Sequence, residues 1–196
     1  QHGDHYYPTF SGVARSINFY PIAPDKPADG IARVAYGLGK YIMGGGMCLR
    51  FSPKYPRKGL QLSSSKAMLR DTQKEFHALD LKGEHYHVST DDAVNLKRLK
   101  IDQVSGDAAF RHVASVYDYQ SDVVRDGTHY EGKRILTFNG ILQHETFPLA
   151  TILQDLLEIG QKEMNLPIEI EFAVNMEVPK GMPNIFNFLQ IRPIVD

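Results

Sequence analysis

The last third of the chain shows the clearest pattern of hydrophobic and polar positions. Apolar residues recur at helical spacing over 149–164, and Pro148 suits the first turn of the helix that this spacing predicts. Apolar and polar residues then alternate over 167–176 and again over 184–193, as in half-buried strands. The connecting residues include two prolines and a glycine, so the chain is predicted to end in a β-hairpin.

Shorter apolar segments predict further strands earlier in the chain. They are rich in β-branched and aromatic residues, which favour a pleated, half-buried surface. These segments are 8–19, 47–51, 75–81, 110–119 and 134–138.

Three further helices are predicted before residue 110. Over 31–38 the apolar residues would form one stripe of a helix, and glycines follow as a stop signal. Ser65 could cap a short helix over 66–72. A second short helix is predicted over 89–100, because it would begin with capping and acidic residues and end with basic ones.

The order of these elements predicts the fold class. A proline-rich connector over 21–27 and a polar segment over 119–132, which is either a loop or a hairpin turn, separate them, and no series of βαβ units is visible. We therefore expect a single α+β domain over 1–196, with a mostly antiparallel sheet, flanking helices and a closing β-hairpin.

Composition excludes several classes of protein. The 196 residues are 42% hydrophobic and 23% charged, which is ordinary for a soluble globular domain. The 22 basic and 23 acidic residues argue against a generic nucleic-acid surface, and a single cysteine excludes a disulfide framework. No apolar run is long enough for a membrane span and no secretory signal is present, so we expect a cytoplasmic protein. The chain starts without methionine, which suggests a piece of a longer protein.

The closing hairpin carries the most informative polar residues. Strand alternation places Glu169 and Glu171 on one face and apolar residues on the other. With the turn centred in the connecting loop, Glu171 would lie opposite Gln190 and Glu169 opposite Arg192. Strict alternation in the second strand would also place its phenylalanines, at 186 and 188, on the face of Gln190 and Arg192.

Two interpretations of this polar group remain open from the residues alone. Glu169 and Arg192 could form a cross-strand ion pair on a solvated face, worth about 0.2–1 kcal/mol. Alternatively, the carboxylates could bind Mg²⁺ together with substrate phosphates, while Arg192 binds phosphate through its planar guanidinium. Phosphoryl transfer depends on such positioning and charge neutralisation.

A family resemblance favours the second interpretation. Residues 167–174 (Pro-Ile-Glu-Ile-Glu-Phe-Ala-Val) and 189–193 (Leu-Gln-Ile-Arg-Pro) resemble the end of the nucleotide-binding domain of phosphoenolpyruvate synthase and pyruvate phosphate dikinase. Upstream, residues 11–14 (Ser-Gly-Val-Ala) and 37–39 (Gly-Leu-Gly) are similar to other motifs of that family, as is the region 147–160.

The resemblance implies the C-terminal lobe of an ATP-grasp fold that binds ATP and Mg²⁺. By motif position, Glu171 would contact the nucleotide or its metal, and Gln190 would lie beside the phosphates. Arg192 would be the catalytic residue that binds phosphate and stabilises the transferred charge. Glu169 stands where the family has an acid, and would be a second metal ligand.

The same resemblance implies partners for this chain, and the chain differs from the family pattern at one position. The partners would be an N-terminal ATP-grasp lobe and a phosphohistidine domain, from which the phosphoryl group would pass to pyruvate or a related acceptor. The chain by itself is expected to bind ATP weakly and to be inactive. Lys40 stands where the family commonly has Glu. That difference favours the alternative of a non-catalytic nucleotide-sensing or interaction module.

Other candidate residues have simpler interpretations. His85 and His87 could bind a metal, but no third ligand stands at a matching spacing, so a polar surface loop is predicted. The glycines at 44–46 precede a strand and lack the Lys-Ser/Thr of a phosphate loop. Cys48 has no recognisable general base and is expected to be a small buried hydrophobic residue.

Overall fold

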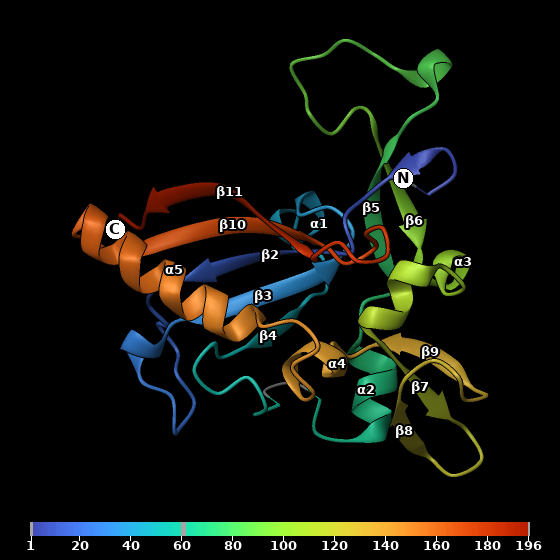
Figure 1. The fold of residues 1–196 in the computed structure, drawn as a ribbon, viewed down its shortest axis with the longest axis horizontal. Helices are drawn as coiled ribbons and strands as arrows, with labels where there is room; N and C mark the ends of the chain where they lie inside the picture. The colour runs from blue at the N-terminus through green and yellow to red at the C-terminus, as the bar shows by residue number, and fades with distance from the viewer. Residues whose placement is uncertain (1, 60–61, 196) are drawn as a thin grey trace.

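A five-stranded antiparallel sheet forms the centre of the computed structural model, which describes residues 2–59 and 62–195 (Figure 1). Within these residues its strand order is β11-β10-β2-β3-β4. The strands are β2 (Phe10–Arg15), β3 (Ile31–Tyr36), β4 (Leu49–Phe51), β10 (Ile168–Asn175) and β11 (Ile185–Pro193). The N-terminal strand β2 thus pairs with β10 from the far end of the chain.

Helix α5 (Leu149–Met164) packs on one face of this sheet and buries an apolar stripe there. Its buried positions include Leu153, Leu157 and Gly160. A methyl group at Gly160 would collide with the side chain of Ile168, so glycine allows the helix to approach β10 closely. We call the face that packs against α5 the inner face, and the opposite face the outer face.

Two smaller antiparallel sheets flank the central one in the described chain. One contains β1 (His5–Tyr6), β5 (Glu75–Asp80) and β6 (Leu96–Lys100); the other contains β7 (Ala114–Asp118), β8 (Val123–Asp126) and β9 (Lys133–Leu136). The shorter α-helices are α1 (Lys40–Met43), α2 (Ser65–Asp71), α3 (Ile101–Val104) and α4 (Asn139–Leu142). Three 3₁₀ helices span Pro27–Asp29, Gly83–His85 and Ala108–His112.

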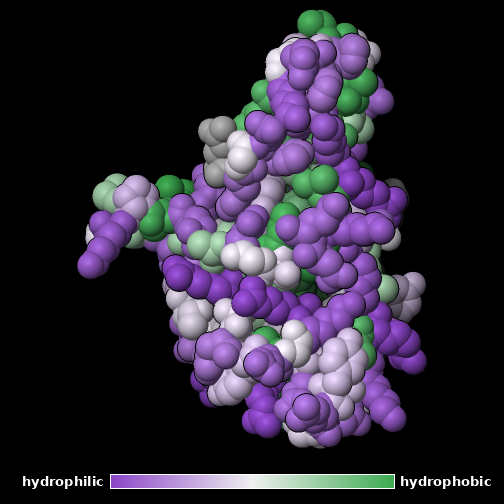
Figure 2. Space-filling model, turned by 90° about the vertical axis from the view of Figure 1, so that its right-hand side faces the viewer, coloured by the Kyte–Doolittle hydropathy of each residue, from purple (hydrophilic) through white to green (hydrophobic). Residues whose placement is uncertain are grey.

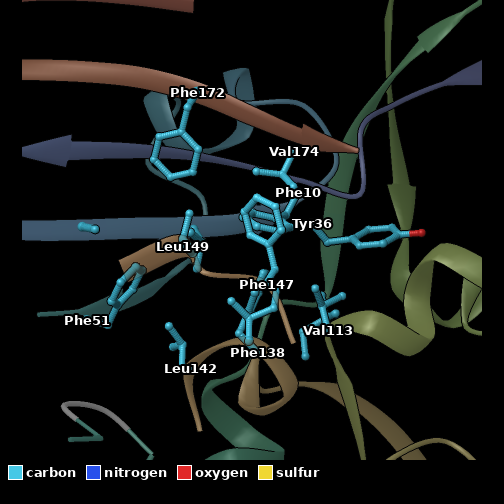
Figure 3. Close-up of a cluster of buried hydrophobic side chains, with 14 of the residues drawn as sticks. Phe10, Tyr36, Phe51, Val113, Phe138, Leu142, Phe147, Leu149, Phe172 and Val174 are labelled. Carbon is cyan, nitrogen blue, oxygen red and sulfur yellow. The ribbon is translucent and has the colours of Figure 1, made fainter. Parts of the chain in front are cut away.

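Aromatic side chains connect the sheets in one core (Figure 3). The ring of Phe10 lies edge-on to Phe138 at 5.6 Å and to Phe147 at 6.4 Å. Tyr36 makes similar contacts with Phe76 of β5 at 5.1 Å and with Phe110 of the 3₁₀ helix before β7 at 5.4 Å. These contacts pack β5 and the segments next to β7 and β9 against the central sheet.

The hairpin formed by β5 and β6 extends away from the body as an arm (Figure 1). The face shown in Figure 2 is largely hydrophilic, with this arm rising above it. Its loop exposes Tyr86 and Val88, at 61% and 91% of their surface. None of the described helices is long and apolar enough to cross a membrane.

Several predicted elements are confirmed, together with the mixed α+β class. The helix over 149–164 and the closing hairpin are present, as are the strands β4 and β5 and the helix α2. The cap of α2 is Ser64 rather than Ser65, because the Ser64 side chain accepts a hydrogen bond from the Ala67 amide.

The predicted helix over 31–38 is wrong, since this segment is strand β3 followed by a turn. Ala32 and Val34 pack into the main core, whereas Ala35 lies on the outer face under Tyr41 and Ile42 of α1. A strand buried on both faces contains a nearly continuous apolar run, which also fits a helical stripe. The strand ends in the turn between β3 and α1, where Gly37 has a φ of +83°.

Three other boundaries also differ from the prediction. The segment 89–100 is not a helix, because 96–100 pairs with β5 and Leu99 packs against the core. A 3₁₀ helix occupies the start of the strand predicted over 110–119. The segment 119–132 begins with a hairpin turn, one of its two predicted forms, but strand β8 also lies within it and pairs with β7.

Candidate functional site

The register predicted for the closing hairpin is confirmed. Glu169 pairs with Arg192, and Glu171 pairs with Gln190. Directly paired residues in an antiparallel sheet project to the same face, and the apolar residues of β10 occupy the inner face. The four polar side chains therefore share the outer face.

The predicted alternation along the second strand is wrong in its first half. A β-bulge follows Glu171, so that Phe172 pairs with Phe188 and the strand then returns to regular pairing. Phe186 consequently stacks on Phe172, with ring centroids 5.2 Å apart. The extra residue, Leu189, shifts the alternation by one position, which directs Phe186 to the core and leaves Gln190 and Arg192 on the outer face.

Glu169 is held between two arginines. Arg15 donates from Nε to Glu169 Oε2 at 2.6 Å, and Arg192 donates from Nε to Oε1 at 2.8 Å. Arg192 Nη2 donates to the same Oε1 atom. The Glu169 side chain is 4% exposed, whereas the two arginine side chains are 42% and 46% exposed. A buried carboxylate thus anchors two guanidinium groups that open to solvent.

This arrangement determines the charge state of the group. Burial by itself would raise the pKa of the Glu169 carboxyl, but the hydrogen bonds from Arg15 and Arg192 outweigh it and hold the pKa below its usual value. The hydrogen bonds to Glu169 likewise raise the pKa of Arg192. Glu169 and Arg192 are therefore both charged at neutral pH.

Arg15 is a site residue that the sequence did not reveal. It comes from β2, 154 positions before Glu169, and reaches the carboxylate because β2 pairs with β10. The hairpin motif itself shows only the partner on β11. An arginine at the end of an apolar strand was the only available signal, and such residues are common at strand ends.

Two more arginines extend the outer face across the sheet. Val13 pairs with Glu171 on one side and with Arg33 on the other, and Arg33 pairs with Arg50 of β4. Arg33 is exposed and Arg50 is half-buried. The outer face thus carries four arginines, since Arg15 and Arg192 lie on it as well, and two glutamates, Glu169 and Glu171. These six residues together have a net positive charge.

The residues fit Mg²⁺ poorly at Glu169. Both of its oxygen atoms already accept hydrogen bonds from guanidinium groups, and a cation there would lie against two positive charges. Among the described residues, no group of three or more His, Cys, Asp or Glu side chains could hold a metal ion. Glu171 remains as one half-buried carboxylate beside Gln190.

The contacts described for Lys40, His85 and His87 are with residues of the arm. Lys40 begins α1 and approaches Asp92 of the arm, with Nζ 3.7 Å from Oδ2. His85 Nδ1 lies 3.0 Å from Asp80 Oδ2, which also accepts from Lys97 at 2.7 Å. The structure therefore places Lys40 in an ion pair with the arm, His85 in a hydrogen bond with Asp80, and the exposed His87 in backbone hydrogen bonds with the side chain of Asn95.

Comparison with known proteins adds no family assignment. No protein-family model matches this chain, and no curated protein matches its sequence. The resemblance to phosphoenolpyruvate synthase and pyruvate phosphate dikinase therefore rests on the sequence motifs alone.

Proposed function

We propose that the outer face is the phosphate-binding side of an ATP-grasp C-terminal lobe, in a phosphotransferase that resembles phosphoenolpyruvate synthase and pyruvate phosphate dikinase. The observation that supports this proposal is the shared outer face of Glu171, Gln190 and Arg192, next to further arginines. A basic face with fixed hydrogen-bond donors is what a triphosphate requires.

The roles proposed for the residues follow from their chemistry. Arg192 binds phosphate oxygens through the N–H groups that point away from Glu169, and stabilises charge that moves during transfer. Gln190 can donate an amide N–H to a neighbouring phosphate oxygen. Glu171 is the carboxylate available to meet the metal that accompanies ATP, and Mg²⁺ would supply charge neutralisation there. In the proposed reaction, ATP phosphorylates a histidine on a separate domain, and pyruvate or a related acceptor then receives the phosphoryl group.

Binding of MgATP tests the nucleotide assignment. Heteronuclear NMR titration suits weak binding, and it would compare the wild-type chain with Glu171→Gln, Gln190→Ala and Arg192→Ala. Arg70→Ala is the matched control, because Arg70 is an exposed arginine on α2 whose partner is its neighbour Asp71. We expect Arg192→Ala to weaken binding at least tenfold, as the loss of a charge-assisted hydrogen bond predicts, and the control to bind like wild type. Equal affinity in all variants would disprove the site.

A second candidate function is a nucleotide-binding module without turnover. Lys40 supports it, because a cation replaces the usual carboxylate and approaches Asp92 of the arm. The discriminating assay incubates the chain with labelled ATP, an N-terminal lobe and a phosphohistidine domain. Transfer of label to histidine would support the enzyme, whereas ATP binding without transfer would support the module.

A further inference from the structure

The unit formed by Arg15, Glu169 and Arg192 differs from a surface ion pair in its geometry. One carboxylate lies at the centre and accepts from a guanidinium on each side. The carboxylate is on β10, the strand between β2 and β11, and it is almost fully buried. Its position is therefore fixed by two strand pairings and by the core beneath it.

The arginines reach this carboxylate from opposite sides. Two inter-strand spacings, about 9.5 Å in all, separate the backbones of β2 and β11. Both side chains lean over β10 toward the same carboxylate, so their guanidinium groups converge. Within the described residues, Arg15 donates to Glu169 only through Nε, and most N–H groups of both guanidiniums remain available.

We infer that Arg15 and Arg192 form a two-arginine clamp for adjacent phosphate groups, and that Glu169 is the positioning residue of this clamp instead of a metal ligand. The inference rests on the function proposed above and extends it to a residue outside the hairpin motif. The substrate class is a polyphosphate, because two convergent cations match two neighbouring anionic groups better than a single phosphate.

Glu169 contributes to the clamp in two ways. It holds two long side chains in one geometry before the ligand arrives, which lowers the entropy lost on binding. It also offsets the repulsion between two guanidinium groups that would otherwise face each other in the empty site.

Polyphosphate binding without metal separates the two roles of Glu169. The chain would be titrated with inorganic tripolyphosphate and with orthophosphate, each in EDTA and each with Mg²⁺. Arg15→Ala and Glu169→Gln are expected to weaken tripolyphosphate binding at least tenfold in EDTA, and to change orthophosphate binding much less. Arg15→Lys keeps the charge without the planar fork and is expected to recover only part of the affinity. Arg70→Ala again serves as the control.

The outcomes distinguish this inference from the proposed function. If Arg192→Ala weakens MgATP binding while Arg15→Ala does not, the clamp is wrong and the nucleotide site stands. If Glu169→Gln weakens binding only when Mg²⁺ is present, Glu169 is a metal ligand after all. If none of these variants changes binding, both proposals fail and the three residues only connect the strands.

One measurement on the wild-type protein avoids variants that fail to fold. The Nε–H resonances of Arg15 and Arg192 would be followed during the tripolyphosphate titration. Both resonances should shift together and saturate at the same ligand concentration. A shift of Arg192 alone would overturn the clamp.

Discussion

Removal of both arginines from Glu169 gives the sharpest prediction about stability. Glu169 is 4% exposed, and its only described side-chain partners are Arg15 and Arg192. The double variant Arg15→Ala, Arg192→Ala would leave this carboxylate without a cation in a site that is still partly buried. A fully buried, uncompensated charge costs about 3–5 kcal/mol, which is the upper limit of the expected fall in the free energy of unfolding at pH 7.

The pH dependence of this loss has a definite sign. In the wild type the pKa of Glu169 is lowered, so its contribution is present above the unfolded value of about 4.3 and is lost as pH falls through the folded pKa. In the double variant the hydrogen bonds are absent and part of the burial remains, so the folded pKa of Glu169 should lie above the unfolded one. Protonation of Glu169 therefore reduces the destabilisation of the double variant as pH falls. The difference in free energy of unfolding between the wild type and the double variant should become smaller from pH 7 to pH 4.5.

Urea denaturation followed by far-UV circular dichroism would measure these differences. The triple variant that adds Glu169→Gln to the double variant is the decisive companion, because a neutral amide removes the buried charge and retains the shape. It should be more stable than the double variant at pH 7. A double variant that loses less than about 1 kcal/mol, or a triple variant with no recovery, would refute the reasoning.

Three further predictions concern stability and use the same urea assay. Gly12→Ala should lower the free energy of unfolding by about 1–3 kcal/mol, because the added methyl would overlap the Phe172 ring. Gly106→Ala should change it little, because the added methyl would meet no described side chain or backbone atom within 4 Å beyond its chain neighbours. Equal effects of the two variants would contradict the packing argument. Ser64→Ala should lower the free energy of unfolding by about 1 kcal/mol, because α2 loses its N-terminal cap. An unchanged midpoint of urea denaturation would show that the cap is dispensable. Asp25→Ala should raise the free energy of unfolding by about 1–3 kcal/mol, because both carboxylate oxygens are buried and accept no hydrogen bond from the described residues. A lower free energy of unfolding in the variant would mean that the carboxylate has a stabilising partner.

Local periodicity was sufficient where one side of an element faces the core. Helix α5 and strand β10 are examples, since each has one buried apolar face and a polar opposite face. The pairing of Glu169 with Arg192 could also be predicted, because both residues belong to the closing hairpin. The two strands of this hairpin follow each other in the chain, and one face of each is buried, which limits the possible registers.

Local periodicity was insufficient where burial came from distant segments. Strand β3 is covered on both faces, by the core and by α1, which made its apolar run resemble a helix. The bulge at Leu189 also could not be predicted, because one extra residue changes the alternation without changing composition.

The sequence by itself determined the polar side chains of the closing hairpin, their pairing and the chemistry they suggest, because these depend on residues close together in the chain. Only the tertiary structure decided what surrounds them. The pairing of β2 with β10 brings Arg15 to Glu169 across 154 positions, and this contact converts an expected metal ligand into a carboxylate that is already bound on both sides. Partners of this kind depend on the order of strands in the sheet, which no short segment encodes.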